Sequence, residues 1–321
     1  MMNIKFGQFL YGLRGLYAEF FGEHISGNIG NFYTEFDSDG AQELIRGKLA
    51  SSQPFMAARF GTVELEALAW EFYRRKPLYK YLDFIQHNIG HWDFPKHVYE
   101  TMEINAGFYP ANSGTLKMFY ELYLSDMREI DILASWQKRE ILFCDAMPTT
   151  RKIRLGDLGP PIGCSEPWTE LLAGKNVLVV HPFEDTIRLQ YSRRENLFKD
   201  PRILPPFNLK TIKAVQSIAK CQTPFASWFE ALDWMKRKMS EVDFDIALIG
   251  CGAYGMPLAA HGKRLGKKAI HLGGALQVLF GIRGKRWDEN SVSQFYNSYW
   301  IRPLDSDRPT NFMKVEDGVY W

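Results

Sequence analysis

Short apolar runs alternate with segments of helical periodicity along most of this chain, and this alternation constrains the fold more than any other feature. Five runs have the character of buried strands, at residues 55–60, 140–145, 175–183, 244–250 and 267–274. Continuous apolar strands with helices between them indicate a mostly parallel sheet that is covered on both faces. We therefore predict an α/β, Rossmann-like fold whose mostly parallel sheet is flanked by helices.

The 321 residues form one domain in this prediction, because we find no internal repeat and no low-complexity linker. A chain of this length buries a full hydrophobic core. We expect an N-terminal helical region over residues 1–50 and a helical insertion over 77–139, between the first two strands. The tail from 286 to 321 alternates aromatic and polar residues, so we expect it to wrap the surface, with Asp305 and Asp307 in a solvated turn.

The N-terminal region begins with apolar residues at three-to-four spacing, which predicts an amphipathic helix. They are Phe6, Phe9, Leu10, Leu13, Leu16 and Tyr17. Lys5, Arg14 and Glu19 interrupt this stretch, which lacks the cleavage site of a signal peptide. No stretch reaches the apolar length of a membrane span. The helix either packs on the domain or docks on a membrane surface or a partner, and both readings stay open.

Charge and cysteine content narrow the compartment and the partners. The formal net charge is only +2, so the composition does not point to nucleic acid, and we expect none as a partner. The four cysteines are far apart and form no C-x-x-C pair, which suits free thiols in a reducing cytosol. We therefore expect a cytoplasmic protein, with peripheral association at the inner face of the membrane left open.

In doubly wound sheets ligands bind beyond the carboxyl ends of the strands, so the turns there carry the functional signal. Gly250, Gly252 and Gly255 form a G-x-G-x-x-G pattern between a strand and a helix, where glycine permits close backbone approach to a phosphate. The next strand ends at His271 and Gly273 rather than at the acidic residue that holds a ribose. This favours a diphosphate or nucleotide over NAD, and the glycines also suit a purely structural turn.

The turn after the first strand has a second set of candidates. Arg59 lies near the strand end, Gly61 permits a tight turn, and Thr62 is a candidate N-cap. Glu64 follows in the first helical turn, where the helix dipole favours an acid. A guanidinium on an apolar strand needs a carboxylate or a ligand phosphate. Arg59 and Glu64 therefore form an internal ion pair or face a ligand together.

Further candidates lie in the middle of the chain. His181 ends a strand, and Glu184 and Asp185 begin the helix beyond it. Any of the three is a candidate base for an acceptor hydroxyl. Alternatively His181 is a core histidine and the acids cap the helix, which is the favoured role of Asp185. Side chains that could stack on a base or sugar, or simply pack, are Trp168, Tyr254 and Trp287.

Three segments resemble one known family. Residues 58–66 (ARFGTVELE), 166–191 and 249–287 are similar to the glycosyltransferases of the GT-D fold type, which come from bacterial surface-glycan loci. The similarity covers most of the chain from about 55 to 290, and the last segment is the most specific. The resemblance implies a Rossmann-like enzyme that transfers a sugar from a nucleotide donor, usually UDP-linked, with a divalent metal.

The family pattern R-F-G-D-x-E implies roles for the turn after the first strand. The arginine matches Arg59, the glycine Gly61 and the glutamate Glu64, whereas Thr62 stands at the aspartate position. Mn²⁺ or Mg²⁺ would then bind through Glu64 and Thr62, which is a weaker ligand set than two carboxylates. Alternatively the site is metal-independent and helix N-termini neutralise the diphosphate together with four basic residues, Arg59, Arg283, Lys285 and Arg286.

From the sequence we thus expect a glycosyltransferase of bacterial surface polysaccharide or glycoprotein glycan synthesis. Its donor is a nucleotide-sugar, its acceptor a glycan or lipid-linked glycan, and its catalytic residues are Glu64, Arg59 and His181. Donor-binding residues are expected at Gly61, Gly250, Gly252, Tyr254, Gly255, His271, Gly273, Lys285 and Arg286. The alternatives are a non-catalytic glycan-assembly or nucleotide-binding module and another Rossmann-type enzyme, a methyltransferase or dehydrogenase.

Overall fold

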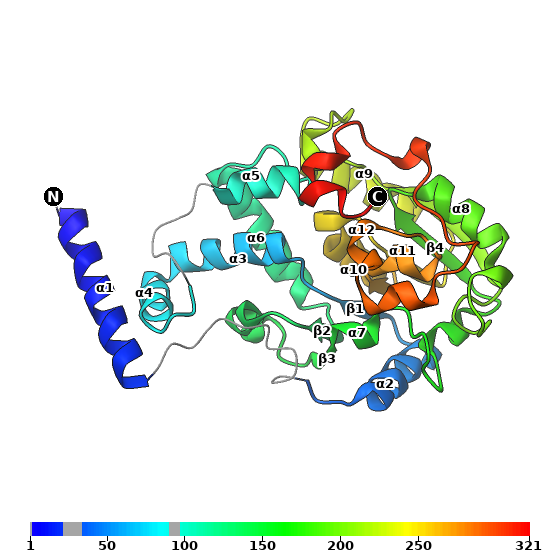
Figure 1. Cartoon of the computed structure of the whole chain (residues 1–321), viewed down its shortest axis with the longest axis horizontal. Coiled ribbons are helices and arrows are strands. Elements are labelled where there is room, and N and C mark those ends of the chain that lie inside the picture. The colour runs from blue at the N-terminus through cyan, green and yellow to red at the C-terminus, as the bar shows by residue number, and fades with distance from the viewer. Residues whose placement is uncertain (1, 22–33, 90–96) are drawn as a thin grey trace.

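A computed structural model describes residues 2–21, 34–89 and 97–321 (Figure 1). Parts of the predicted N-terminal region and of the predicted insertion, residues 22–33 and 90–96, lie outside the described chain. A seven-stranded sheet with the order β3-β2-β1-β7-β6-β4-β5 forms the centre, and all its neighbouring strands are parallel. The predicted α/β, Rossmann-like architecture is confirmed. The strands are β1 Phe55–Ala58, β2 Ile132–Ser135, β3 Arg151–Arg154, β4 Asn176–His181, β5 Asn208–Lys213, β6 Ile246–Ile249 and β7 Lys268–His271.

Helices cover the sheet and extend beyond it (Figure 1). Those of the first half are α1 Met2–Phe21, α2 Ser38–Ala50, α3 Thr62–Arg75, α4 Pro77–Ile85, α5 His97–Ile104, α6 Ser113–Met127 and α7 Leu155–Leu158. Those of the second half are α8 Glu184–Ser192, α9 Trp228–Ser240, α10 Gly255–Arg264, α11 Ala275–Leu279 and α12 Lys285–Asp288. Among the described helices, none has the length and apolarity that crossing a bilayer requires. All four cysteines are free thiols, as predicted.

The core is split by the sheet into two layers, because successive strand residues point to opposite faces. In β1, Met56 and Ala58 pack with α3, α6, α9 and α10 on one face, whereas Phe55 and Ala57 pack with α2, α8 and α11 on the other. All four side chains are fully buried. This two-sided burial explains why the central strands have nearly continuous apolar sequences.

The strand predicted at 140–145 is wrong. These residues belong to a 3₁₀ helix, η1 Lys138–Ala146, and the strand at this place in the fold is β2, just before it. The Glu140 carboxylate accepts hydrogen bonds from the backbone N–H groups of Trp136 and Gln137 and from the Ser135 hydroxyl. This cap begins the helical turn and overrides the local apolar pattern.

The segment between β1 and β2 is helical, although not over the whole predicted range. Helices α4, α5 and α6 lie within residues 77–139, but Ile132–Ser135 is strand β2. The end of the predicted insertion therefore has to be corrected, because these four residues are buried in the sheet rather than outside it. Their short run, ILAS, ends in serine and was too brief to be recognised as a strand.

The carboxyl ends of the strands form a crevice. The chain leaves β1 for α3 and β6 for α10 on one face, whereas it leaves β7 for α11 and β4 for α8 on the other. Neighbouring strands β1 and β7 therefore send their helices to opposite sides, as do β6 and β4. Such a divergence opens the space in which doubly wound folds bind ligands.

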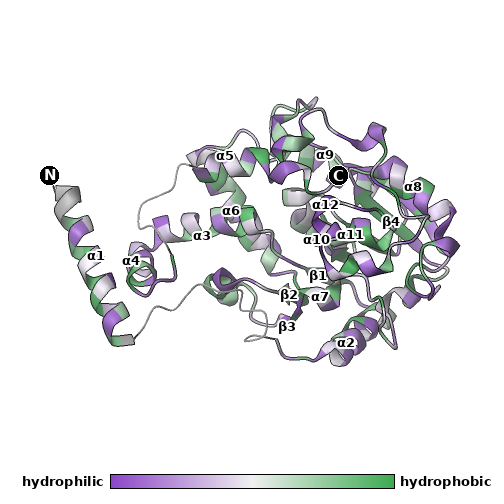
Figure 2. Ribbon diagram, viewed as in Figure 1, coloured by the Kyte–Doolittle hydropathy of each residue, from purple (hydrophilic) through white to green (hydrophobic). Residues whose placement is uncertain are grey.

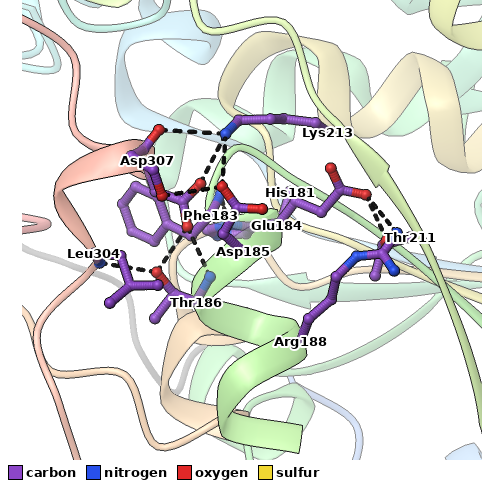
Figure 3. A network of polar contacts seen from close by, with 11 residues as sticks. His181, Phe183, Glu184, Asp185, Thr186, Arg188, Thr211, Lys213, Leu304 and Asp307 are labelled. Carbon is purple, nitrogen blue, oxygen red and sulfur yellow. Dashed lines mark hydrogen bonds and ion pairs between the residues drawn. The ribbon is translucent and has the colours of Figure 1, made fainter.

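The C-terminal tail lies over this edge of the sheet in single turns of 3₁₀ helix. Trp300 anchors it through a hydrogen bond from Nε1 to the carbonyl of Leu197. The solvated turn predicted for Asp307 is wrong, since this residue is only 1% exposed. Its carboxylate accepts from the N–H and hydroxyl of Thr186 in the first turn of α8, at 2.8 and 2.7 Å (Figure 3). Asp305, by contrast, is exposed as predicted.

Candidate functional site

A cavity of about 710 Å³ lies beyond the carboxyl ends of the strands. Each of the seven strands contributes to its lining through the turn that follows it, and the C-terminal tail closes one side. The volume is typical of a pocket for a small-molecule ligand. The structure brings most of the predicted site residues to it, namely Arg59, Gly61, Thr62, Glu64, His181, Gly250, Gly252, Tyr254, His271, Gly273 and Arg286. Two predicted residues, Gly255 and Lys285, do not line it.

Arg59 places a guanidinium in this cavity directly after β1. Its carbon Cζ lies 5.2 Å from the centre of the Trp136 ring. Gly273, with φ +59°, leaves the room for it, because a Cβ there would lie 3.0 Å from Nη1. In the described chain Arg59 has no ion pair within 4 Å, so the predicted internal pair with Glu64 does not form. Burial lowers the pKa of Arg59, and the Glu64 charge opposes this shift.

Glu64 lies in the first turn of α3 and is 8% exposed. Its carboxylate folds back over Gly61: a Cβ at residue 61 would lie 1.9 Å from Oε2. Burial raises the pKa of Glu64, against the lowering effects of its own backbone N–H and of Arg59. A carboxylate whose pKa is raised by burial accepts a proton more readily than a solvated one, which suits a general base.

Thr62 does not cap α3 as predicted. Gly61 is the N-cap residue, and no side chain caps this end of the helix. Thr62 is instead the first helical residue and is exposed to the cavity. The Glu64 carboxylate occupies the space in which a side chain at residue 61 would stand, which accounts for the glycine at the N-cap.

The glycines of the turn after β6 have two different roles. Gly250 packs against the neighbouring turn, because a Cβ there would lie 2.6 Å from the Gly273 carbonyl oxygen. Gly252, with φ +57°, is exposed and presents its backbone to the cavity. Gly255 only makes room for the His271 ring, whose Nε2 would lie 2.2 Å from a Cβ. Close backbone approach thus remains available at Gly252, at the amino end of α10.

His181 is buried and lines the cavity at the end of β4. Its Nδ1 accepts a hydrogen bond from the N–H of Phe183, at 2.9 Å. Burial lowers the pKa of His181 to about 3, so the ring is neutral at physiological pH. A neutral imidazole that accepts at Nδ1 carries its proton on Nε2. This geometry favours a hydrogen-bond donor over the general base that the sequence suggested.

His271 also stays neutral. Burial, with a smaller contribution from the Arg59 charge, lowers its pKa to about 3. Its ring fills the space left by Gly255 at the start of α10. His271 therefore packs against the start of α10, and it brings no positive charge to a phosphate.

The other two predicted bases, Glu184 and Asp185, lie outside the cavity lining. Glu184 accepts from the Thr211 hydroxyl and pairs with Arg188 at 3.0 Å, and Asp185 accepts from the Ser306 hydroxyl (Figure 3). Asp185 does not cap α8 either, because the Asp307 carboxylate from the tail takes that role. These residues fasten α8 to its neighbours.

The tail brings Arg286 to the cavity. Arg286 pairs with Glu316 at 2.6 Å and lies 4.6 Å from the centre of the Tyr320 ring. Lys285 turns outward, is exposed, and reaches only the carbonyl oxygen of Asp317. Its predicted donor-binding role is therefore not supported, because consecutive residues of α12 point in different directions.

Aromatic side chains line much of the cavity. Tyr254 and Trp287 do so as anticipated, whereas Trp168 is fully buried elsewhere. Sequence reasoning missed Trp136 and Tyr320. Trp136 follows the unrecognised strand β2, so finding that strand would have found the residue. Tyr320 is distant in sequence from every strand, and no local pattern could identify it.

The donor set does not fit a metal ion held by the protein. Among the described residues no group of three His, Cys, Asp or Glu side chains could ligate a metal. Glu64 and Glu316 are the carboxylates of the described lining, and Glu316 is already paired with Arg286. The neighbouring Arg59 guanidinium also disfavours a cation beside Glu64.

Comparison with known proteins finds no matching family model, no similar curated protein and no similar solved structure.

Proposed function

We propose that the protein is a glycosyltransferase whose cavity holds a nucleoside diphosphate sugar. The observation that carries this proposal is the Arg59 guanidinium, which is largely buried in a ligand-sized cavity without an ion pair within 4 Å in the described chain. A buried cation without a partner is costly, and a ligand anion removes that cost. The exposed Gly252 backbone lies in the same lining, where it adds an N–H donor.

The chemistry follows from this arrangement. An acceptor hydroxyl attacks the anomeric carbon, the bond from that carbon to the diphosphate oxygen breaks, and its electron pair leaves with the diphosphate. Arg59 stabilises the charge that develops on the diphosphate, and Arg286 assists once it releases Glu316. The hydroxyl proton passes to Glu64, whose raised pKa suits a base. His181 donates its Nε2 proton in a hydrogen bond to a donor oxygen.

The bacterial surface glycan, the UDP moiety and the lipid-linked acceptor remain part of the proposal on the strength of the sequence resemblance. The metal is treated separately. Because the lining residues do not form a metal site, we propose that neutralisation of the diphosphate rests on arginine side chains and backbone N–H groups. Thr62, at the position where the family has aspartate, then lines the cavity without serving as a metal ligand.

Ligand-induced thermal stabilisation tests this function. We expect UDP to raise the unfolding temperature of the protein, in the presence of EDTA as well as of Mn²⁺, because binding to the native state stabilises it. NAD and S-adenosylmethionine in parallel samples represent the dehydrogenase and methyltransferase alternatives. Stabilisation by either of these and by no nucleoside diphosphate would reject the proposal. A screen of donor hydrolysis across UDP-, GDP- and dTDP-sugars then separates an enzyme from a non-catalytic binding module.

Variants connect that result to the site. We expect Arg59→Gln to weaken UDP binding by roughly 10- to 100-fold, since a charge-assisted hydrogen bond contributes about 1.5 to 3 kcal/mol. Arg286→Gln should have a smaller effect, because its charge is shared with Glu316. Lys285→Gln is the matched control, a neighbouring cation outside the lining. Equal affinities for Arg59→Gln and Lys285→Gln would show that the diphosphate does not bind at Arg59.

A further inference from the structure

Helix α1 and residues 74–85, which comprise the end of α3 and all of α4, form an arm of the molecule. This arm carries an unusual share of the exposed apolar surface. Fifteen large hydrophobic side chains are exposed in the described chain, and eight belong to this arm. They are Phe6, Phe9, Tyr11, Leu16 and Phe20 on α1, and Leu78, Tyr79 and Leu82 on α4. Figure 1 places α1 at the far end of the molecule from the sheet, next to α4. Concentrated apolar exposure of this kind marks a binding surface.

One face of α1 already has a partner. Leu10 is buried, and the rings of Phe6 and Tyr11 lie 5.3 and 5.1 Å from those of Tyr81 and Phe84. The Arg14 guanidinium donates to the carbonyls of Phe84 and Ile89, each at 2.7 Å. These contacts fix α1 to α4 in a defined orientation.

A second apolar stripe runs beside that packed face. Phe9, Leu16 and Phe20 are seven and four residues apart, which places them on one side of the helix. Their exposed fractions are 60%, 52% and 76%. The polar residues Gln8 and Glu19 lie on another side, and Figure 2 shows hydrophobic residues along the whole length of α1. The helix is therefore apolar over a wider arc than its contact with α4 requires.

The charge of the arm indicates which partner fits. Residues 2–21 and 74–85 contain six basic residues and two acidic ones, a net charge of +4, whereas the whole chain has only +2. The remainder of the protein is thus net negative. Three basic residues, 74–76, directly precede the exposed Leu78 and Tyr79. Of these, Arg74 pairs with Glu71 and Arg75 with Glu121, so Lys76 is the cation of this run that an anionic partner would meet. A second copy of this arm would be repelled by the same charge, whereas an anionic surface would attract it.

We propose that this arm docks the protein on an anionic lipid bilayer. The stripe of Phe9, Leu16 and Phe20, with Leu78 and Leu82, inserts at the boundary between headgroups and acyl chains, and Lys76 and Lys80 contact lipid phosphates. Helices that combine aromatic and leucine side chains with basic residues bind in this way, lying in the interface without spanning the membrane. The proposal does not depend on the enzymatic function proposed above.

Vesicle flotation of the full chain tests the proposal. We expect the protein to float with vesicles of phosphatidylcholine and phosphatidylglycerol, to float much less with phosphatidylcholine alone, and to detach as NaCl is raised. The variant Phe9→Gln/Leu16→Gln/Phe20→Gln should bind at least tenfold more weakly. Its matched control is Ile141→Gln/Leu189→Gln/Met313→Gln, three exposed apolar residues outside the arm, which should bind as the native protein does.

A charge variant keeps the test valid if the stripe variant fails to fold. We expect Lys76→Gln/Lys80→Gln to weaken binding to anionic vesicles by about fivefold per charge and to leave the unfolding temperature nearly unchanged. Equal binding to neutral and anionic vesicles, or no flotation with either, would overturn the proposal. So would a concentration-dependent dimer in sedimentation velocity that the stripe variant abolishes, because the occupant would then be a second copy of the chain.

Discussion

Arg59 and Glu64 lie close together in sequence where the chain passes from β1 to α3, but different contacts fix their side chains. The arginine extends from the end of β1 over the Trp136 ring. The glutamate folds back over Gly61 at the start of α3. Their charges influence each other, but they form no ion pair. Two opposite charges that are held apart in a cavity leave both available to a ligand, whereas a closed ion pair would not.

Adding a methyl group at Gly61 tests the role of the Glu64 carboxylate. The backbone of Gly61, with φ −77°, accepts alanine, but a Cβ would overlap the Glu64 carboxylate. We expect Gly61→Ala to lower donor turnover roughly 100-fold, the low end of what a positioned base contributes. Its unfolding temperature should fall by only a few degrees, since alanine is a poorer N-cap than glycine.

Gly47→Ala supplies the control for that variant. It adds the same methyl group on α2, where no atom lies within 4 Å of the new Cβ. Turnover should remain native. If Gly61→Ala also retained native turnover, the position of the Glu64 carboxylate would be irrelevant to the reaction, and Glu64 would lose its assigned role as base.

At the scale of elements, four of the five inner strands were predictable from sequence, whereas β2 and the two edge strands were not. β1, β4, β6 and β7 are buried on both faces and have continuous apolar runs. The edge strands β3 and β5 have the sequences RKIR and NLKTIK, and each of them has a single buried residue. A sequence pattern reports burial, so an edge strand that is held mainly by backbone hydrogen bonds gives almost no signal.

The contact between the tail and α8 gives a prediction at the same scale. Asp307 satisfies the Thr186 N–H and hydroxyl and pairs with Lys213 at 2.9 Å (Figure 3). We expect Asp307→Ala to lower the free energy of unfolding by roughly 3 kcal/mol, because it leaves the buried N–H and hydroxyl of Thr186 without their acceptor, whereas Lys213 keeps Asp185 as a partner. Urea denaturation measures this loss.

Asp305→Ala is the natural comparison, two residues away in the same turn. Asp305 is almost fully exposed and pairs only with Arg308. Its removal should change the free energy of unfolding by less than about 0.5 kcal/mol. Equal losses for the two variants would mean that the cap on α8 contributes nothing specific.

For the whole molecule, the site is predictable only as far as the strands are. Arg59, His181 and Gly250 lie at or just after the ends of recognisable strands. The carboxyl ends of parallel strands meet at one edge of the sheet, so these residues are expected to lie close together. The lining residues Glu316 and Tyr320 reach the cavity because the tail folds back over it. Their place depends on long-range packing, which leaves no periodic trace in the sequence.

The two buried histidines predict how stability changes with pH. Burial lowers the pKa of both His181 and His271 from 6.5 to about 3. As the pH falls from 6.5 towards 3, the unfolded chain takes up protons that the native state does not, so stability is lost over this window. Each histidine contributes a slope of about 1.4 kcal/mol per pH unit. Urea denaturation between pH 7 and pH 4 measures the slope.

Asp126 acts in the opposite direction over part of that window. Burial raises its pKa from 3.8 to about 6 despite its pair with Arg264. It therefore favours the native state at low pH, and this contribution is lost as the pH rises through 6. Burial also raises the pKa of Glu64 and of Glu140, which therefore act in the same direction as Asp126. The histidine contribution is isolated by comparing variants with the native protein. We expect His181→Gln to reduce the slope; a slope identical to that of the native protein would contradict the buried, neutral state of His181.

The cap that Asp307 places on α8 joins the last turns of the chain to the wall of the cavity. Since Glu316 and Tyr320 follow this anchor, a protease cut between residues 308 and 315 would separate one side of the ligand site from it and leave the sheet standing. We therefore expect that ligand binding can be lost while the sheet stays folded. A nicked sample would keep its far-ultraviolet spectrum and lose its ligand.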